Sequence, residues 1–189
     1  MRFEEKYNSL MQSLLTEDVH NGVALLPGGF KPPHKGHFEA LKHIINENKA
    51  SAAIVYIGKP DRDGITADQS KQIWDIYSNY INVPVTAIIS QVTPVKSVYE
   101  YADENKNIPL FVGAGEEDMK RYAWFEKNKD DFPLVNLVPI PPQFGRISGT
   151  DTRKKIQDND LESLNFIPDQ IHWTDKEVIY KDILGLTVK

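Results

Sequence analysis

Two histidines three residues apart follow a glycine-rich turn, in the stretch GGFKPPHKGH from Gly28 to His37. On the first turn of a helix, His34 and His37 project from one face, and Gly36 between them leaves that face open. Glycines allow the sharp turn, and the unpaired N–H groups and dipole of the helix start favour an anion. Two imidazoles directed at one anion indicate phosphoryl chemistry. The structural alternative is that His34 caps the helix and that His37 is a satisfied, partly buried histidine.

A second polar stretch, from Ile147 to Lys155, is expected to begin another helix. Ser148 occupies the N-cap position and Asp151 follows three residues later, the spacing of a capping box. A cap does not explain why Arg153 and two lysines come so close to a helix N-terminus, which normally favours acids. A bound polyphosphate would remove this conflict by accepting hydrogen bonds from the helix start and a bidentate contact from Arg153. The residues of the helix start that would donate are Ser148, Gly149 and Thr150.

Strand and helix patterns alternate around these two stretches. Short apolar runs typical of buried parallel strands lie at residues 23–26, 51–57, 84–89, 110–112 and 134–140. Amphipathic patterns between them predict helices. We therefore expect an α/β protein with a Rossmann-like, open, mainly parallel five-stranded sheet and helices on both faces. In such sheets ligands bind beyond the carboxyl ends of the strands.

The chain divides into three predicted parts. Residues 1–22 are expected to form an amphipathic N-terminal helix, residues 23–157 the α/β core, and residues 158–189 a helical tail packed on that core. A chain of 189 residues with 40% hydrophobic residues is long enough to bury one such core.

Composition excludes several classes of function. A formal charge of -5 argues against a general nucleic-acid binder, which needs a basic surface. The absence of cysteine excludes disulfides, thiolate zinc sites and a cysteine nucleophile. The sequence shows neither a signal peptide nor an apolar run of membrane-spanning length. We therefore expect a cytoplasmic protein with no nucleic-acid or membrane partner, and a homo-oligomer is compatible with the sequence.

Both stretches resemble the signature motifs of the HxGH nucleotidyltransferase superfamily, the cytidylyltransferase-like proteins. The first motif, Gly-x-Phe-x-Pro-x-His-x-Gly-His, is matched from Gly28 to His37. The second, Ile-Ser-x-Thr-x-x-Arg, is matched at Ile147, Ser148, Thr150 and Arg153. Members transfer a nucleoside monophosphate from ATP or CTP to an acceptor, usually a phosphate monoester, and release pyrophosphate. The resemblance thus implies a nucleotide and a phosphate acceptor as partners.

The resemblance also implies roles for individual residues. His34 and His37 would contact the triphosphate near the α-phosphate, and Arg153 would hold the β and γ phosphates. Lys31 stands where many relatives carry Asp or Gln, so it either binds acceptor phosphate or marks a different acceptor; we group it with the catalytic residues. Mg²⁺ is expected from the family. It would be coordinated by phosphates and water, because the sequence shows no carboxylate cage. The remaining nucleotide-binding candidates are Gly28, Gly29, Phe30, Gly113, Gly115, Ile147, Ser148, Gly149 and Thr150.

Among the members of this superfamily, the sequence most resembles the nicotinamide or nicotinate mononucleotide adenylyltransferases, which indicates the acceptor. In these relatives the loop after the fourth strand handles the nucleotide and a tryptophan stacks on the pyridine ring, which suggests Trp124. Gly115 replaces an Asp often found in that loop, and Trp124 at its present offset would equally well fill the core. Lys59 and Arg62 follow the second strand and are candidates for a phosphate of the acceptor, although a solvated charged loop explains them too.

The sequence therefore predicts an enzyme that transfers AMP from ATP to a mononucleotide. One alternative is cytidylyl or adenylyl transfer to a sugar, polyol or pantetheine phosphate. A second alternative is a non-catalytic nucleotide-binding module that acts through its first helix. Class I aminoacyl-tRNA synthetases share a related histidine turn, but this chain is too short and too acidic for that role.

Overall fold

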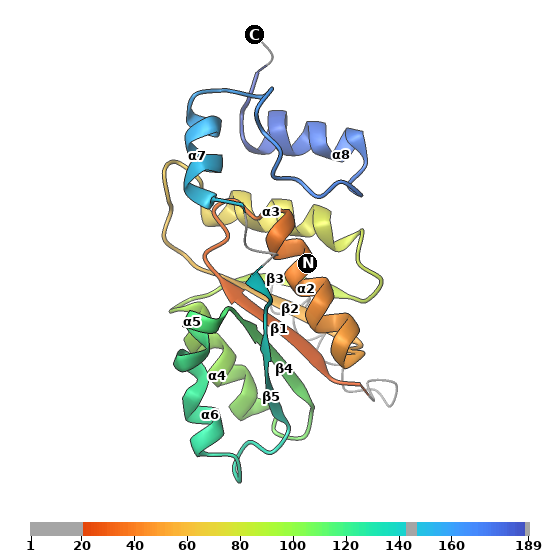
Figure 1. Cartoon of the computed structure of the whole chain (residues 1–189), viewed down its shortest axis with the longest axis vertical. Helices are drawn as coiled ribbons and strands as arrows, with labels where there is room; N and C mark the ends of the chain where they lie inside the picture. The colour runs from red at the N-terminus through yellow and green to blue at the C-terminus, as the bar shows by residue number, and fades with distance from the viewer. Residues whose placement is uncertain (1–20, 143–146, 188–189) are drawn as a thin grey trace.

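The computed structural model describes residues 21–142 and 147–187 of the chain. Five strands form one sheet in the order β3-β2-β1-β4-β5, and every pairing is parallel (Figure 1). The strands are β1 (Val23–Gly28), β2 (Ala52–Ile57), β3 (Val85–Ile89), β4 (Leu110–Ala114) and β5 (Val135–Pro139). This order is that of a doubly wound Rossmann-like sheet, which confirms the predicted fold class. The N-terminal helix predicted over residues 1–22 falls almost entirely outside the described residues.

Helices cover both faces of the sheet (Figure 1). On one face lie α2 (Lys35–Asn48) and α3 (Ala67–Ser78), joined by the later elements α7 (Gly149–Gln157), α8 (Trp173–Glu177) and the π-helical turn η3 (Val178–Ile183). On the other lie α4 (Pro94–Glu104), α5 (Glu116–Met119), the 3-10 turn η1 (Lys120–Tyr122) and α6 (Ala123–Lys127). The sheet is therefore sandwiched, and the strands' carboxyl ends remain open at one edge.

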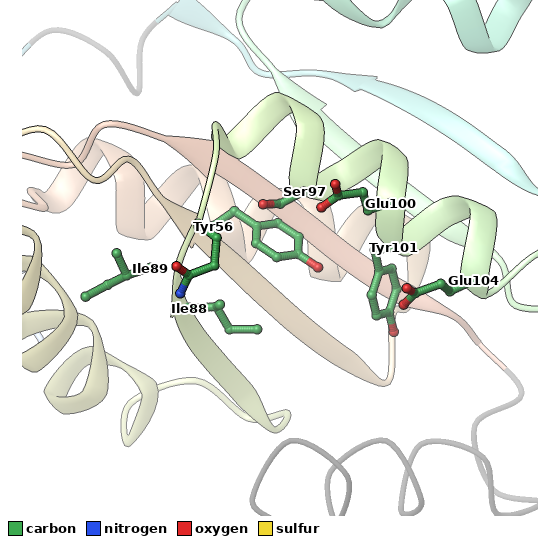
Figure 2. Close-up of a pocket in the computed structure, with 8 residues that line it drawn as sticks. Tyr56, Ile88, Ile89, Ser97, Glu100, Tyr101 and Glu104 are labelled. Atoms are coloured by element: carbon green, nitrogen blue, oxygen red, sulfur yellow. The ribbon is translucent and has the colours of Figure 1, made fainter. Parts of the chain in front are cut away.

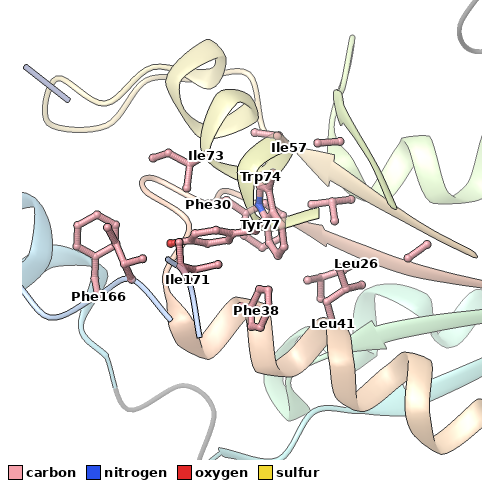
Figure 3. Packing of buried hydrophobic residues seen from close by; sticks show 14 of the residues in the cluster. Leu26, Phe30, Phe38, Leu41, Ile57, Ile73, Trp74, Tyr77, Phe166 and Ile171 are labelled. Atoms are coloured by element: carbon pink, nitrogen blue, oxygen red, sulfur yellow. The ribbon is translucent and has the colours of Figure 1, made fainter. Parts of the chain in front are cut away.

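An aromatic cluster anchors the turn that carries the histidines (Figure 3). Phe38 of α2 meets Tyr77 of α3 edge-on, with 5.6 Å between ring centroids, and Trp74 meets Tyr77 in the same way at 5.7 Å. Phe30, in the turn after β1, packs edge-on against Trp74 at 5.5 Å. Because these rings are buried, the turn after β1 is fixed from beneath by the core.

The segment after α7 supports the start of α2. The backbone N–H of Lys35 donates to the carbonyl of Phe166 at 2.6 Å, and the Lys35 ammonium donates to Asn165 at 3.3 Å. The side chain of Gln69 in α3 donates to the carbonyl of Ile183 at 2.8 Å. Phe166 is itself buried in the core cluster of this face. The C-terminal segment thus braces the helix start that presents the two histidines.

Gly113 lets α2 approach β4 closely. The sequence break at this glycine predicted that the strand ends at Val112, but β4 continues, and Gly113 pairs with Val138 of β5. A Cβ atom on Gly113 would lie 2.1 Å from Cδ1 of Ile44 and 2.8 Å from its Cγ1. The missing side chain therefore sets how near α2 lies to the centre of the sheet.

We predict that Gly113→Ala lowers the free energy of unfolding by about 1–3 kcal/mol, because the new methyl group overpacks against Ile44. Urea unfolding followed by circular dichroism measures the change. Gly115→Ala is the matched control, since no atom lies within 4 Å of its Cβ position. Adding Ile44→Val removes Cδ1 and should recover part of the loss; a Gly113→Ala variant as stable as the wild type would contradict the close approach.

Candidate active site

A cleft of about 750 Å³ opens at the carboxyl ends of the strands. It lies where the chain order reverses between β1 and β4, the switch point at which open α/β sheets bind ligands. Eight of the residues that the sequence predicted for the site line it: Gly28, Gly29, Phe30, His34, His37, Arg62, Gly113 and Gly115. The histidine turn and the turn after β4 therefore face each other across this cleft.

The two histidines form a stacked pair. Their ring centroids lie 3.5 Å apart with an interplanar angle of 20°, and Phe30 meets the His37 ring edge-on at 4.9 Å. The backbone N–H of His34, at the N-cap of α2, donates to Nδ1 of His37 at 3.2 Å. Because Nδ1 of His37 accepts this bond, a neutral His37 carries its proton on Nε2 and is a donor there.

Burial keeps both imidazoles neutral at pH 7. Desolvation lowers the pKa of His34 from 6.5 to about 4. The pKa of His37 is lowered well below its usual value, first by burial and then by the neighbouring His34. Nδ1 of His34 is buried and has no hydrogen-bond partner among the described residues. A buried polar atom without a partner at the wall of a cleft is a place where a ligand or a water is expected.

Arg153 joins the second motif to the first. Its Nε donates to the Asp63 carboxylate at 2.6 Å, one terminal nitrogen donates to the carbonyl of Lys31 at 3.1 Å, and the other donates to the Thr150 hydroxyl at 3.1 Å. The side chain is 12% exposed. The predicted N-cap is present, because Ser148 Oγ accepts from the backbone N–H of Asp151 at 3.1 Å.

The second motif lies beside the cleft rather than in its wall. Neither Arg153 nor residues 147–150 belong to the lining formed by the described part of the chain. Ile147 and Gly149 are half-buried, whereas Ser148 and Thr150 are exposed. The Lys31 carbonyl that accepts from Arg153 precedes His34 by three residues, so the guanidinium is attached directly to the histidine turn.

The Lys31 ammonium is held by backbone carbonyls. Its side chain is buried, and Nζ donates to the carbonyls of Gly29 at 2.9 Å and Gly58 at 2.7 Å. Burial lowers its pKa from 10.5 to about 8, while Asp61 raises that pKa and Arg62 lowers it further. The ammonium is thus used by two backbone carbonyls, and Lys31 is absent from the described lining.

The three predicted acceptor residues have different surroundings. Arg62 lines the cleft, whereas Lys59 is exposed outside its lining. Trp124 is 47% exposed and also lies outside the lining. Its ring packs edge-on against Tyr99 and Phe132, with centroids 5.5 and 5.2 Å away. In this arrangement the indole forms part of a surface aromatic cluster and neither fills the core nor faces the cleft.

The sequence did not predict several lining residues. Asp118 and Arg121 line the cleft and form an ion pair at 3.1 Å, and Tyr122 lies beside them. Three consecutive acids, Glu116 to Asp118, suit a helix N-terminus, so the sequence pattern alone does not indicate that Asp118 lies at the switch point. Residues 92–95, from the end of the loop after β3 into the first turn of α4, also contribute. The rule that loops after parallel strands border the site would have found them.

Comparisons with known proteins place this geometry in a fold family. No protein-family model and no curated protein matches the chain. Among solved structures, nicotinic acid mononucleotide adenylyltransferase of Plasmodium falciparum, complexed with APC, matches with a TM-score of 0.58 at 17% identity, covering 90% of this chain and 100% of that one. A putative nicotinate-nucleotide adenylyltransferase of Vibrio parahaemolyticus matches with a TM-score of 0.57 at 16% identity, covering 83% and 97%. The chain has the fold of the mononucleotide adenylyltransferases.

A third match adds to the same fold family. The bifunctional NMN adenylyltransferase/ADP ribose pyrophosphatase of Francisella tularensis matches with a TM-score of 0.53 at 16% identity, covering 87% of this chain and 51% of that one. The adenylyltransferase-like fold is consistent with the superfamily that the two motifs resemble.

A second, smaller pocket of about 230 Å³ lies between β3 and α4 (Figure 2). Its wall carries Glu100 and Glu104 from α4, together with Ser97 and the ring of Tyr56. Two carboxylates beside this space disfavour a polyanion. Of these two spaces, the switch-point cleft is therefore the better place for an anion.

The described part of the chain contains neither a candidate metal cluster nor a candidate membrane-spanning helix. Residues 21–142 and 147–187 contain no group of three or more His, Asp or Glu that could hold a metal ion. Across those same residues, no helix combines the length and apolarity that a membrane crossing requires.

We predict that acid destabilises the protein partly through His34. The unfolded chain takes up this proton near pH 6.5 and the folded chain near pH 4, so stability is present above 6.5 and is lost as the pH falls toward 4. The free energy of unfolding should fall in both proteins between pH 7 and pH 5. We expect this fall to be about 1–2 kcal/mol smaller in His34→Asn than in the wild type. Urea titrations at both pH values measure this; equal losses would contradict a neutral, buried His34.

Proposed function

We propose that the protein is a nucleotidyltransferase that transfers AMP from ATP to a mononucleotide, nicotinamide or nicotinate mononucleotide, and releases pyrophosphate. The observation that carries this proposal is the direct bond between the two motifs beside the cleft, where Arg153 donates to the Lys31 carbonyl, three residues before the first of the stacked histidines. Solved structures of the same fold are adenylyltransferases, complexed in two cases with APC and NaAD, which supports a nucleotide substrate.

The reaction needs no general base in the protein. The acceptor phosphate has a second pKa near about 6, so it is already a dianion at pH 7. One of its oxygens forms a bond to the α-phosphorus of ATP while the bond from that phosphorus to the α,β-bridging oxygen breaks, and pyrophosphate leaves. Positioning and stabilisation of the developing charge then supply the catalysis. A cleft that offers hydrogen-bond donors meets this requirement.

Before a ligand binds, the neutral histidines offer hydrogen-bond donors rather than positive charge. Nε2–H of the neutral His37 is available to an oxygen of the α-phosphate, because its Nδ1 is occupied by the N–H of His34. A bound triphosphate would raise the pKa of both rings and favour proton uptake. His34 offers its unpartnered nitrogen as a further contact. Oxyanion donors of this kind are each worth about 10²–10³ in kcat.

Arg153 would hold the β and γ phosphates. Asp63 and Thr150 keep its guanidinium beside the cleft, and a triphosphate would compete with them for its N–H groups. Two other arginines, Arg62 and Arg121, line the cleft and are candidates for the acceptor phosphate. Lys59 and Trp124 lie outside the lining, so the proposal does not depend on them.

Magnesium would enter with the nucleotide. Within the described residues no cluster of three or more carboxylates and histidines fits a protein-bound metal. Mg²⁺ would then be coordinated by phosphate oxygens and water, as part of the substrate, which is its usual mode at nucleotide sites.

A panel assay tests this proposal. Pyrophosphate release is measured with ATP and with CTP against nicotinamide mononucleotide, nicotinate mononucleotide, and sugar, polyol and pantetheine phosphates. Turnover that requires ATP and a mononucleotide is the expected result. Turnover with CTP alone would contradict adenylyl transfer, and ATP binding in calorimetry without turnover on any acceptor would identify a non-catalytic module.

We predict that His37→Asn lowers kcat by at least about 10²-fold while the fold is retained. The Asn amide oxygen can replace Nδ1 as acceptor for the His34 N–H, but it cannot replace the donor at Nε2. His172→Asn is the matched control, because His172 is an exposed N-cap of α8, a position that Asn also favours. A His37→Asn enzyme with wild-type kcat would remove His37 from the reaction.

A further inference from the structure

A buried ammonium joins the two turns that border the cleft. Lys31 Nζ donates to the carbonyl of Gly29, in the turn after β1, and to the carbonyl of Gly58, directly after β2. Gly29 and Gly58 both line the cleft, whereas Lys31 is not part of its described lining. The two turns are also joined by a bond from the N–H of Gly58 to the carbonyl of Gly28 at 2.8 Å.

These contacts set the direction of two peptide groups. In a trans peptide the C=O and the following N–H point in opposite directions. With the carbonyls of Gly29 and Gly58 turned toward the ammonium, the N–H groups of Phe30 and Lys59 are turned away from it. The lysine therefore orients backbone donors of the turns that border the anion site.

The backbone of the same residue receives the second motif. The Lys31 carbonyl accepts from the Arg153 guanidinium at 3.1 Å. One residue thus fixes the spacing of two turns through its side chain and the place of the arginine through its backbone.

We propose that Lys31 is a positioning residue of the triphosphate site, acting through the Gly29 and Gly58 carbonyls and through Arg153 rather than by touching the substrate. The inference rests on the proposed function of the cleft. Its ammonium strengthens both carbonyl contacts and adds positive potential behind a site for a polyanion. Loss of the proton leaves an amine that donates more weakly and carries no charge.

Acidic and basic side chains from two segments surround Lys31. Asp61 and Arg62 come from the loop after β2, and Arg153 from α7 is paired with Asp63. Carboxylates remain ionised and arginines protonated between pH 7 and pH 9. The histidines are neutral there, and terminal phosphates have lost their last proton. Affinity for ATP should therefore fall as the pH rises through about 8, the pKa of Lys31.

Calorimetry with ATP from pH 6.5 to pH 9.5, together with kcat and KM where turnover occurs, tests the role. The variants are Lys31→Met, Lys31→Arg and, as matched control, Lys71→Met on the solvent side of α3. At pH 7, Lys31→Met should weaken ATP binding at least about 10-fold, the loss expected for charge-assisted bonds, and should abolish the decline above pH 8. Lys31→Arg keeps its charge, so its alkaline decline should vanish even if its affinity is lower.

The outcomes separate the two proposals. ATP binding without turnover overturns the enzyme function but leaves the role of Lys31 to be judged from the dissociation constants. A wild type that binds no ATP overturns both. An unchanged affinity in Lys31→Met, or an alkaline decline that persists in Lys31→Arg, overturns the positioning role alone. Should Lys31→Met not fold, the wild-type and Lys31→Arg profiles decide.

Discussion

The hydrogen bond from the Arg153 guanidinium to the Lys31 carbonyl joins two motifs that are 122 residues apart in the chain. The rest of the fold brings the two motifs to this point. The order of the sheet brings the ends of β1 and β4 together, and the bare backbone of Gly113 lets α2 lie close to them. The segment after α7 then returns to hold the start of α2 through the carbonyl of Phe166.

The chemistry of the cleft follows from the burial of its basic groups. An exposed histidine pair would be partly charged near neutral pH, whereas His34 and His37 are kept neutral and stacked by the core beneath them. Neutral imidazoles offer fixed donors and can take up charge when a polyphosphate arrives. The positive charge beside the cleft comes instead from arginines and from the ammonium of Lys31, which donates hydrogen bonds to backbone carbonyls. This arrangement separates the groups that contact a ligand from the groups that hold them in place.

Local patterns in the sequence predicted most of the described elements, although β4 continues past its predicted end. The cap at Ser148 predicted where α7 begins, and the apolar runs predicted where the strands lie, because these signals depend on neighbouring residues. The two motifs predicted the histidine turn and its distant arginine. The sequence pattern did not predict the directions in which the side chains point. Nothing next to Lys31 in sequence indicates that Gly58, 27 residues away, captures its ammonium.

The same limit applies to the acceptor side of the cleft. Trp124 was predicted either to stack on a ring or to fill the core, but Tyr99 and Phe132, from separate segments, hold it at the surface. Asp118 and Arg121 carry no motif, and they reach the cleft because β4 ends beside β1. Residues whose place is set by tertiary packing alone had to be found in the structure.

The central claim is that both motifs hold one triphosphate in the switch-point cleft. A crystal structure of the protein with a non-hydrolysable ATP analogue tests it most directly. The account predicts the α-phosphate against Nε2 of His37 and the outer phosphates against Arg153, with its guanidinium released from Asp63. A nucleotide bound elsewhere, for example in the pocket between β3 and α4, or one whose phosphates touch neither motif, would contradict it.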